Sequence, residues 1–197
     1  MKKICVLKVG KEYSVRHAQW LARQVPDLIC ISNVDVPTVP TLKMLVPWES
    51  WWCKMNMFHP DLIQDDLLYI DLDTVVLGDL NQFEMKKSTM LSDFYRPQLP
   101  GSGFMFIKHE DKRAVWTEWL KNPDRHMKRC VTREHWGDQG FLRDVLPHQR
   151  WQTVCPDKVV SFKVHCQKKL PEGADVVCFH GNPRPWQVGK HWVPRLA

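Results

Sequence analysis

The sequence lacks the features that define several large classes of protein. It has no run of about 18 apolar residues, so we expect no transmembrane helix. The opening MKKICVLKVG is interrupted by Lys8 and Gly10 too early for a signal peptide, and it reads as a β-strand. Its seven cysteines include no C-x-x-C pair, which predicts reduced thiols in a cytoplasmic protein without a disulfide or zinc framework. No internal repeat or low-complexity tract divides the chain.

What the sequence does contain indicates one folded domain with an uneven charge. The 197 residues, 44% of them hydrophobic, are enough to build a core and exclude a wholly disordered chain. Residues 1–98 carry 11 Lys and Arg against 12 Asp and Glu, whereas residues 99–197 carry 17 against 10. Either the basic second half is a solvated surface, or it meets an anionic partner.

Apolar strands alternate with helical segments along the chain. This alternation predicts an α/β fold with a mainly parallel sheet, in which ligands bind beyond the carboxyl ends of the strands. The segment 34–47 carries three prolines and is expected to be a long connection. The expected strands are 4–9, 28–32, 67–70, 88–94, 103–108 and 175–179, and the expected helices are 14–24, 48–58, 112–121 and 138–146.

Two carboxylates, Asp71 and Asp73, directly follow the apolar strand 67–70. At this spacing both side chains can point to one face, where they can converge on a common target. Hard oxygen ligands of this kind suit Mg²⁺ or Mn²⁺, whose remaining positions are commonly filled by substrate phosphates. Two alternatives stay open: an aspartate nucleophile of a phosphatase, and solvated carboxylates in a loop.

Other polar groups also follow expected strands or begin expected helices. In VVCFHGNPRPW (176–186) a strand is followed by His180, a candidate metal ligand, and by Arg184, which has the geometry for a phosphate. Asp138 and Gln139 stand at a helix start, where Asp138 is either an N-cap or a contact for substrate hydroxyls. Lys54 lies in an aromatic helix and either reaches solvent or binds a phosphate. The small residues of a turn before residues 104–108 leave backbone N–H groups open: Gly101, Ser102 and Gly103.

The order of these segments resembles glycosyltransferase family 8, the glycogenin and bacterial lipopolysaccharide galactosyltransferase type, in the manner of a small phage-encoded member. The segments that carry the resemblance are WWCKMNMF (51–58), LLYIDLDTVVLGDL (67–80), GSGFMFI (101–107), WGDQGFL (136–142) and FHGNPRPW (179–186). It implies a GT-A fold, with a mixed, mainly parallel sheet flanked by helices in a single Rossmann-like domain over 1–197. The nucleotide-sugar part would be about 1–108 and the acceptor-facing part about 109–197.

The resemblance also implies an activity: metal-dependent transfer of a sugar, from a UDP-sugar by preference, to an acceptor hydroxyl. Asp71, Asp73 and His180 would bind Mn²⁺ or Mg²⁺, and Asp138 and Gln139 would face the transferred sugar as catalytic residues. The remaining donor contacts would be Val9, Tyr13, Lys54, Leu72, Gly101, Ser102, Gly103, Gly181 and Arg184. The basic second half suggests a nucleic acid acceptor, such as a modified base of phage DNA, or another polyanion.

Two departures and two rival readings accompany this resemblance. Family members usually carry lysine at the position of Arg184, and the turn VGKEYS lacks their usual small residues. The sequence DLDTV also fits a haloacid-dehalogenase-like phosphatase with Asp71 as nucleophile and Asp73 as general acid/base. Such an enzyme needs an acidic pair downstream, and the only candidate, Asp138 with Asp144, lies in an expected helix at a spacing that does not match. A non-catalytic nucleic-acid-binding protein would explain the basic half and leave Asp71, Asp73 and His180 without a role.

Overall fold

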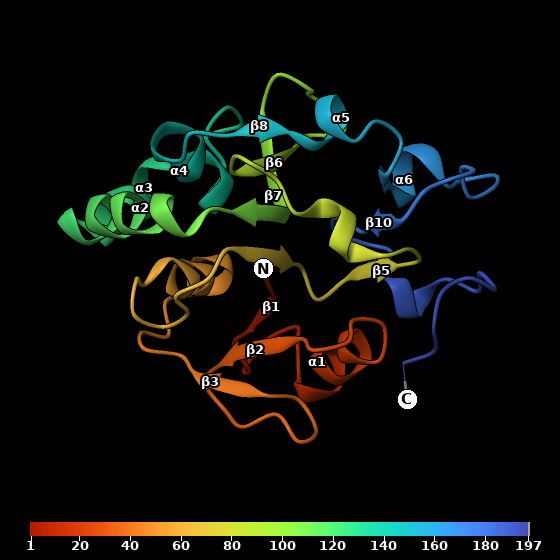
Figure 1. The fold of residues 1–197 in the computed structure, drawn as a ribbon, viewed down its shortest axis with the longest axis horizontal. Helices are drawn as coiled ribbons and strands as arrows, with labels where there is room; N and C mark the ends of the chain where they lie inside the picture. The colour runs from red at the N-terminus through yellow and green to blue at the C-terminus, as the bar shows by residue number, and fades with distance from the viewer. Residues whose placement is uncertain (197) are drawn as a thin grey trace.

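A mixed seven-stranded sheet organises the computed structural model, which describes residues 1–196 (Figure 1). The strand order is β3-β2-β1-β4-β7-β6-β8, and a smaller sheet has the order β5-β10-β9. The strands are β1 (Lys2–Leu7), β2 (Ile29–Ser32), β3 (Thr41–Lys43), β4 (Leu67–Ile70), β5 (Thr74–Val76), β6 (Thr89–Ser92), β7 (Pro100–Ile107), β8 (Gln149–Arg150), β9 (Val159–Ser161) and β10 (Val176–Cys178).

The sheet is parallel around β1 and changes direction at β7. Strands β3, β2, β1 and β4 pair in parallel, whereas β7 runs antiparallel to both β4 and β6. The pair β6 and β8 is again parallel. In the small sheet β10 pairs antiparallel with β5 and parallel with β9. The carboxyl ends of β1 and β4 therefore lie at the same edge, and β10 reaches that edge through its pairing with β5.

The helices lie on both sides of the main sheet. In Figure 1, α2, α3 and α4 gather on one side of the upper half, while α1 lies beside β1 and β2 in the lower half. The α-helices are α1 (Val15–Ala22), α2 (His109–Lys121), α3 (Pro123–Arg129), α4 (Gly137–Val145), α5 (Trp151–Val154) and α6 (Phe162–His165). The 3₁₀ helices are η1 (Ser50–Phe58), η2 (Leu80–Phe83) and η3 (Pro185–Gln187).

The central strands are apolar throughout because both of their faces are buried. Successive side chains point to opposite faces of a strand. In β7, Phe104 and Phe106 join the core under α1 and α5, whereas Met105 and Ile107 join the core under η1, α2 and α4. The same division holds along β1 and β4. A continuous apolar run such as Leu67–Ile70 is therefore what a doubly covered strand requires.

Most of the predicted elements are present, and some of the sequence predictions were wrong in detail. The helix predicted over 48–58 is a 3₁₀ helix over Ser50–Phe58, and the connection 34–47 contains the short edge strand β3. The glycines of 100–103 form no turn, because they belong to β7. There the backbone N–H of Asp71 donates to the carbonyl of Gly103 at 2.9 Å, and a Cβ at Gly103 would lie 3.1 Å from Asp71 Oδ2. Glycine thus makes room for the carboxylate.

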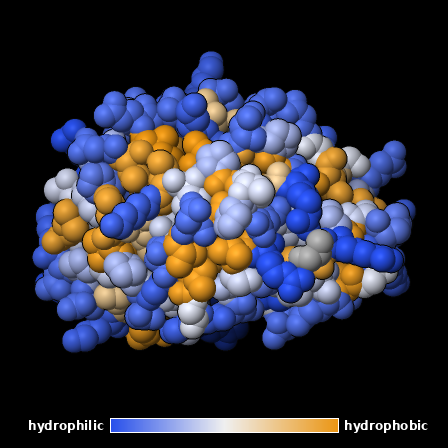
Figure 2. Space-filling model, turned by 90° about the horizontal axis from the view of Figure 1, so that it is seen from below, coloured by the Kyte–Doolittle hydropathy of each residue, from blue (hydrophilic) through white to orange (hydrophobic). Residues whose placement is uncertain are grey.

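The remaining observations on the fold concern the cysteines, membrane-spanning helices and the exposed apolar residues. Within residues 1–196 all seven cysteines are free, and six of them are buried. No helix in this described part is both long enough and apolar enough to cross a membrane. Figure 2, which views the molecule from the β3 side, shows apolar residues gathered across the middle of that face among hydrophilic ones. The exposed Val34, Leu45 and Val46 flank β3 in the sequence.

Candidate functional site

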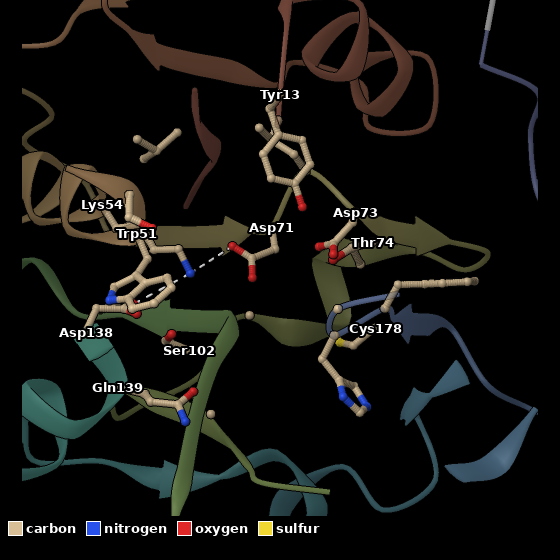
Figure 3. A pocket seen from close by; sticks show the side chains of 18 of the residues that line it. Tyr13, Trp51, Lys54, Asp71, Asp73, Thr74, Ser102, Asp138, Gln139 and Cys178 are labelled. Carbon is tan, nitrogen blue, oxygen red and sulfur yellow. Dashed lines mark ion pairs between the residues drawn. The ribbon is translucent and has the colours of Figure 1, made fainter. Parts of the chain in front are cut away.

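A pocket of about 870 Å³ opens at the carboxyl ends of β1 and β4 and extends to the segment after β10 (Figure 3). Every site residue predicted from the sequence lines this pocket, although the residues come from six separate segments. They are Val9, Tyr13, Lys54, Asp71, Leu72, Asp73, Gly101, Ser102, Gly103, Asp138, Gln139, His180, Gly181 and Arg184. Their roles stay predictions, but the fold brings the predicted groups together.

Asp71 stands directly after β4 and is held by two neighbours. The Tyr69 hydroxyl donates a hydrogen bond to Asp71 Oδ1, and Lys54 Nζ lies 2.9 Å from the same oxygen. Tyr69 is almost fully buried, whereas the Asp71 side chain keeps 29% of its surface exposed toward the pocket. The carboxylate is therefore fixed in orientation and still open to a ligand.

Asp73 lies beside Asp71 but is buried, with 4% of the residue exposed. Burial, and then the charge of Asp71, raise the pKa of Asp73 to about 7. The Arg184 guanidinium opposes this by forming an ion pair with Asp73, and it also pairs with Glu12 at 2.6 Å. The Arg184 guanidinium also lies over the ring of Tyr13, 5.4 Å from its centroid. Arg184 thus connects the turn after β1 to the carboxylate pair.

Lys54 joins Asp71 to Asp138 across the pocket. Lys54 Nζ lies 3.6 Å from Asp138 Oδ2, and although burial alone lowers the pKa of Lys54, the Asp138 and Asp71 carboxylates raise it overall. Asp138 occupies the first turn of α4, whose N-cap is Trp136 and not Asp138. Burial raises the Asp138 pKa, and its Oδ2 has no hydrogen-bond partner. Asp138 lines the pocket, and a carboxylate oxygen that has an ion-pair partner but no hydrogen bond can still accept one from a ligand.

His180 lines the pocket but turns its ring nitrogen elsewhere. His180 Nε2 lies 2.6 Å from Ser161 Oγ, and the ring stacks on Phe94 at 5.6 Å between centroids. Burial, and then the charge of Lys163, lower the pKa of His180, which favours the neutral ring. Among residues 1–196 no three His, Cys, Asp or Glu side chains are grouped to hold a metal ion. The His180 ligand role therefore stays a prediction, and Nε2 could serve it only by leaving Ser161.

The two aspartates alone nevertheless fit a hard divalent cation. Each supplies carboxylate oxygens at the edge of the pocket, and their mutual repulsion contributes to the raised pKa of Asp73. A cation between them would remove that repulsion. Mg²⁺ and Mn²⁺ commonly use one or two carboxylates and fill the rest of the shell with water and substrate phosphates. Two protein ligands are thus compatible with such a site.

Two residues of the pocket lining, Trp51 and Trp136, and one residue beside the lining, Lys163, were not predicted. Lys163 Nζ lies 3.4 Å from where a Cβ of Gly181 would be, and Lys163 makes no side-chain ion pair or hydrogen bond in the described chain. Trp51 and Trp136 line the mouth. Lys163 carries no sequence signal, because α6 is brought to the pocket only by the pairing of β9 with β10. Trp51 and Trp136 each begin a motif segment, WWCKMNMF (51–58) and WGDQGFL (136–142). This position is the sequence feature that could have identified them as pocket residues.

The charge of the pocket differs from that of the chain. Its lining includes six carboxylates (Glu12, Glu49, Asp71, Asp73, Asp93, Asp138) and four cationic side chains (Lys8, Lys11, Lys54, Arg184). Of the Lys and Arg residues after position 98, Arg184 is the one found in that lining. The positive excess of the second half is therefore located outside the pocket, on other surfaces of the described chain.

Comparison with known proteins shows what the architecture resembles. No protein-family model and no curated protein sequence matches the chain. The structure is similar to the glycosyltransferase GlyE of Streptococcus pneumoniae TIGR4, with a TM-score of 0.65 and 14% identity over 94% of this chain and 56% of that one. The chain thus spans little more than half the length of GlyE.

Two other solved glycosyltransferase structures are also similar to this chain. The galactosyltransferase LgtC, in complex with donor and acceptor sugar analogs, matches with a TM-score of 0.58 and 12% identity over 94% of this chain and 89% of LgtC. The bifunctional glycosyltransferase WbbM matches with a TM-score of 0.58 and 11% identity over 94% of this chain and 46% of that one. At such identities a likeness establishes the fold and not the activity. The chain has the α/β fold of GT-A glycosyltransferases, with a mixed seven-stranded sheet flanked by helices.

Proposed function

We propose that this protein is a metal-dependent glycosyltransferase that uses a nucleoside diphosphate sugar, with a UDP-sugar as the favoured donor. The observation that carries the proposal is the convergence of Asp71, Asp73 and Asp138 with Lys54 and Arg184 in one pocket of a glycosyltransferase fold. In the reaction the bond from the anomeric carbon to the diphosphate breaks and a bond to an acceptor oxygen forms. The nucleoside diphosphate leaves with the electron pair, and the proton of the acceptor hydroxyl passes to the departing diphosphate oxygen or to water.

Different residues of the pocket would bind the metal ion, the diphosphate and the nucleoside. Asp71 and Asp73 would hold Mn²⁺ or Mg²⁺, which as a Lewis acid stabilises negative charge on the leaving diphosphate. Lys54 and Arg184 are fixed by their carboxylate partners and add positive charge on either side of the same position. Val9 and Tyr13, in the turn after β1, line the end where the nucleoside would bind.

Asp138 and Gln139 would contact the transferred sugar. Both lie in the first turn of α4, and Asp138 keeps one buried oxygen without a hydrogen-bond partner. A sugar hydroxyl can donate to that oxygen, which would orient the anomeric carbon toward the acceptor. The charge of Asp138 also favours the positive charge that develops on the sugar ring in the transition state.

Calorimetric titration of UDP and GDP, with and without Mn²⁺, tests the proposal. We expect UDP binding that requires Mn²⁺ and that falls at least tenfold in Asp73→Asn, since the variant lacks a charged oxygen ligand. The control is Asp79→Asn, which changes an exposed N-cap of η2 on the same segment outside the pocket. The proposal is wrong if neither nucleotide binds the wild-type protein with Mn²⁺, or if Asp73→Asn binds as tightly as Asp79→Asn.

A further inference from the structure

Two exposed indole rings, Trp51 and Trp136, meet at the mouth of the pocket. They expose 38% and 48% of their surface, whereas the other eight tryptophans are buried or half-buried. Their ring centroids are 5.7 Å apart and their planes are tilted by 46°. Large apolar side chains left next to each other in solvent at the opening of a cavity commonly mark a place where a ligand covers them.

The backbone holds this pair in place. Trp51 belongs to η1, and Trp136 is the N-cap of α4. Gly137, between Trp136 and Asp138, has a φ of +61°, and a Cβ there would lie 2.7 Å from Trp51 Nε1. Because glycine alone accepts this conformation and this close approach without strain, the indole of Trp51 can lie directly against the start of α4. The two rings are therefore a defined surface and not two independent side chains.

The tryptophan pair adjoins the polar groups of the site. Trp51 precedes Lys54 by three residues, and Trp136 precedes Asp138 by two. In Figure 3 the Trp51 ring lies beside Lys54 and Asp138, on the Asp138 side of the carboxylate pair. A flat ligand that covers the indoles would lie beside Asp138, the residue proposed to contact the transferred sugar. This position is next to the transferred sugar and away from the nucleoside end at Tyr13.

The charged residues near the tryptophan pair favour a neutral flat ligand over a polyanion. Lys54, the cation beside the tryptophan pair, is already shared by Asp71 and Asp138. A nucleic acid strand stacked on the indoles would therefore find no free counter-charge there for its phosphates. A pyranose ring is neutral, and one of its faces carries C–H bonds whose hydrogens are slightly positive. The face of an indole is the negative part of its quadrupole and attracts such hydrogens.

We propose that Trp51 and Trp136 form a subsite that binds a pyranose ring of a neutral saccharide acceptor by stacking. This inference rests on the proposed glycosyltransferase function and adds the class of the acceptor to it. The apolar face of the pyranose covers the two indoles, and its hydroxyl-bearing edge points toward the transferred sugar. The basic surface of the second half takes no part in this contact.

Fluorine NMR of protein labelled with 5-fluorotryptophan tests the subsite without metal or nucleotide. The resonances of the pair are assigned with Trp51→Phe and Trp136→Phe. We expect methyl β-D-glucopyranoside or methyl β-D-galactopyranoside to shift both resonances saturably, while the resonance of Trp116, which packs on Trp48 and His59 far from the pocket lining, stays fixed. Trp136→Ala should weaken saccharide binding at least fivefold, and Trp136→Phe should weaken it less.

The outcomes separate this inference from the proposed function. If neither glycoside moves the two resonances, or if a dT12 oligonucleotide moves them and the glycosides do not, the saccharide subsite is wrong. Mn²⁺-dependent UDP binding measured on the same sample would then still support a glycosyltransferase. If the glycosides shift the resonances and UDP does not bind, the subsite stands and the donor chemistry fails. Trp136→Ala must also leave UDP affinity unchanged, since a change there would indicate a general structural role.

Discussion

Charged residues of the pocket neutralise one another in pairs, whereas one cation beside the pocket has no such partner. Asp71 has Lys54, and Asp73 has Arg184, so the carboxylates and cations hold the site together without a ligand. Lys163 has no such partner, although its ammonium lies near the backbone of Gly181. A cation that is not already paired can offer its whole charge to an anionic ligand.

We predict that Lys163→Met weakens Mn²⁺-dependent UDP binding by about fivefold to tenfold, the value of one charge-assisted hydrogen bond at a half-exposed site. Calorimetry measures the affinity, and thermal unfolding should show no change in Tm, since no intramolecular bond is lost. Lys168→Met, five residues along and exposed, is the matched control. Equal affinities of the two variants would show that Lys163 does not contact the nucleotide.

The chemistry-bearing residues could be predicted from the sequence because their type and their place along the chain are informative together. Asp71, Asp73 and His180 each follow an apolar strand, and the ends of neighbouring strands meet at one edge. Lys163 could not be found in this way, because its position depends on how α6 packs, which no local pattern in a single sequence encodes. Trp51 and Trp136 each begin a motif segment, but that the two indoles meet depends on how η1 and α4 pack.

At the scale of elements, α2 carries an unusual buried charge. Lys112 is fully buried, its ammonium donates to the carbonyl of Ile63, and burial lowers its pKa to about 8 from an ordinary value of 10.5. Between these two values the unfolded chain binds more protons than the folded one. Lys112 therefore makes the free energy of unfolding rise with pH across this interval.

We predict that Lys112→Met removes this pH-dependent contribution. Relative to the variant, the wild-type protein should gain up to about 3 kcal/mol between pH 8 and pH 10.5, because each pKa unit corresponds to about 1.4 kcal/mol. Urea unfolding of both proteins at several pH values measures the difference between their free energies of unfolding. Taking this difference removes the contribution of the buried thiols, which titrate in both proteins. Lys121→Met at the exposed end of α2 should show no such trend. A constant difference between wild type and Lys112→Met would contradict the prediction.

Elements with a strong local pattern were the predictable ones. Strand β4 was placed at its true bounds because four fully buried residues end at the first carboxylate. The bounds of β7 were not, because glycine usually marks a turn, and here it serves the close approach of Asp71. The short α5, α6 and β9 were missed since segments of three or four residues are defined by their packing and not by periodicity.

In the whole molecule, the last described segment closes onto the first helix. The indole N–H of Trp20 donates to the carbonyl of Pro194 at 2.9 Å, and Arg23 donates to that of Arg195 at 3.3 Å. Val193 belongs to the core that α1 covers. These contacts join the two ends of the sequence over the same core.

We predict that a chain ending at Gly189 has a Tm lower by about 5–10 °C. The loss of one buried valine and one good hydrogen bond costs about 2–4 kcal/mol, and each kcal/mol corresponds to about 2–4 °C in a domain of this size. Scanning calorimetry measures the change, and Val164→Ala, an exposed position, is the control. An unchanged Tm would mean that the segment after Gly189 contributes no stability to the fold.

The link between Arg184 and Asp73 joins residues 111 positions apart. A ribosome releases Asp71 and Asp73 long before it releases Arg184, so during synthesis the carboxylate pair exists without its main counter-charge. Strand β10, which carries the chain back to this place, also emerges among the last segments. Contacts of such high sequence separation form late and slow folding. The pocket is therefore complete only after β10 and Arg184 have been synthesised, and until then Asp71 and Asp73 lack the guanidinium that opposes their mutual repulsion.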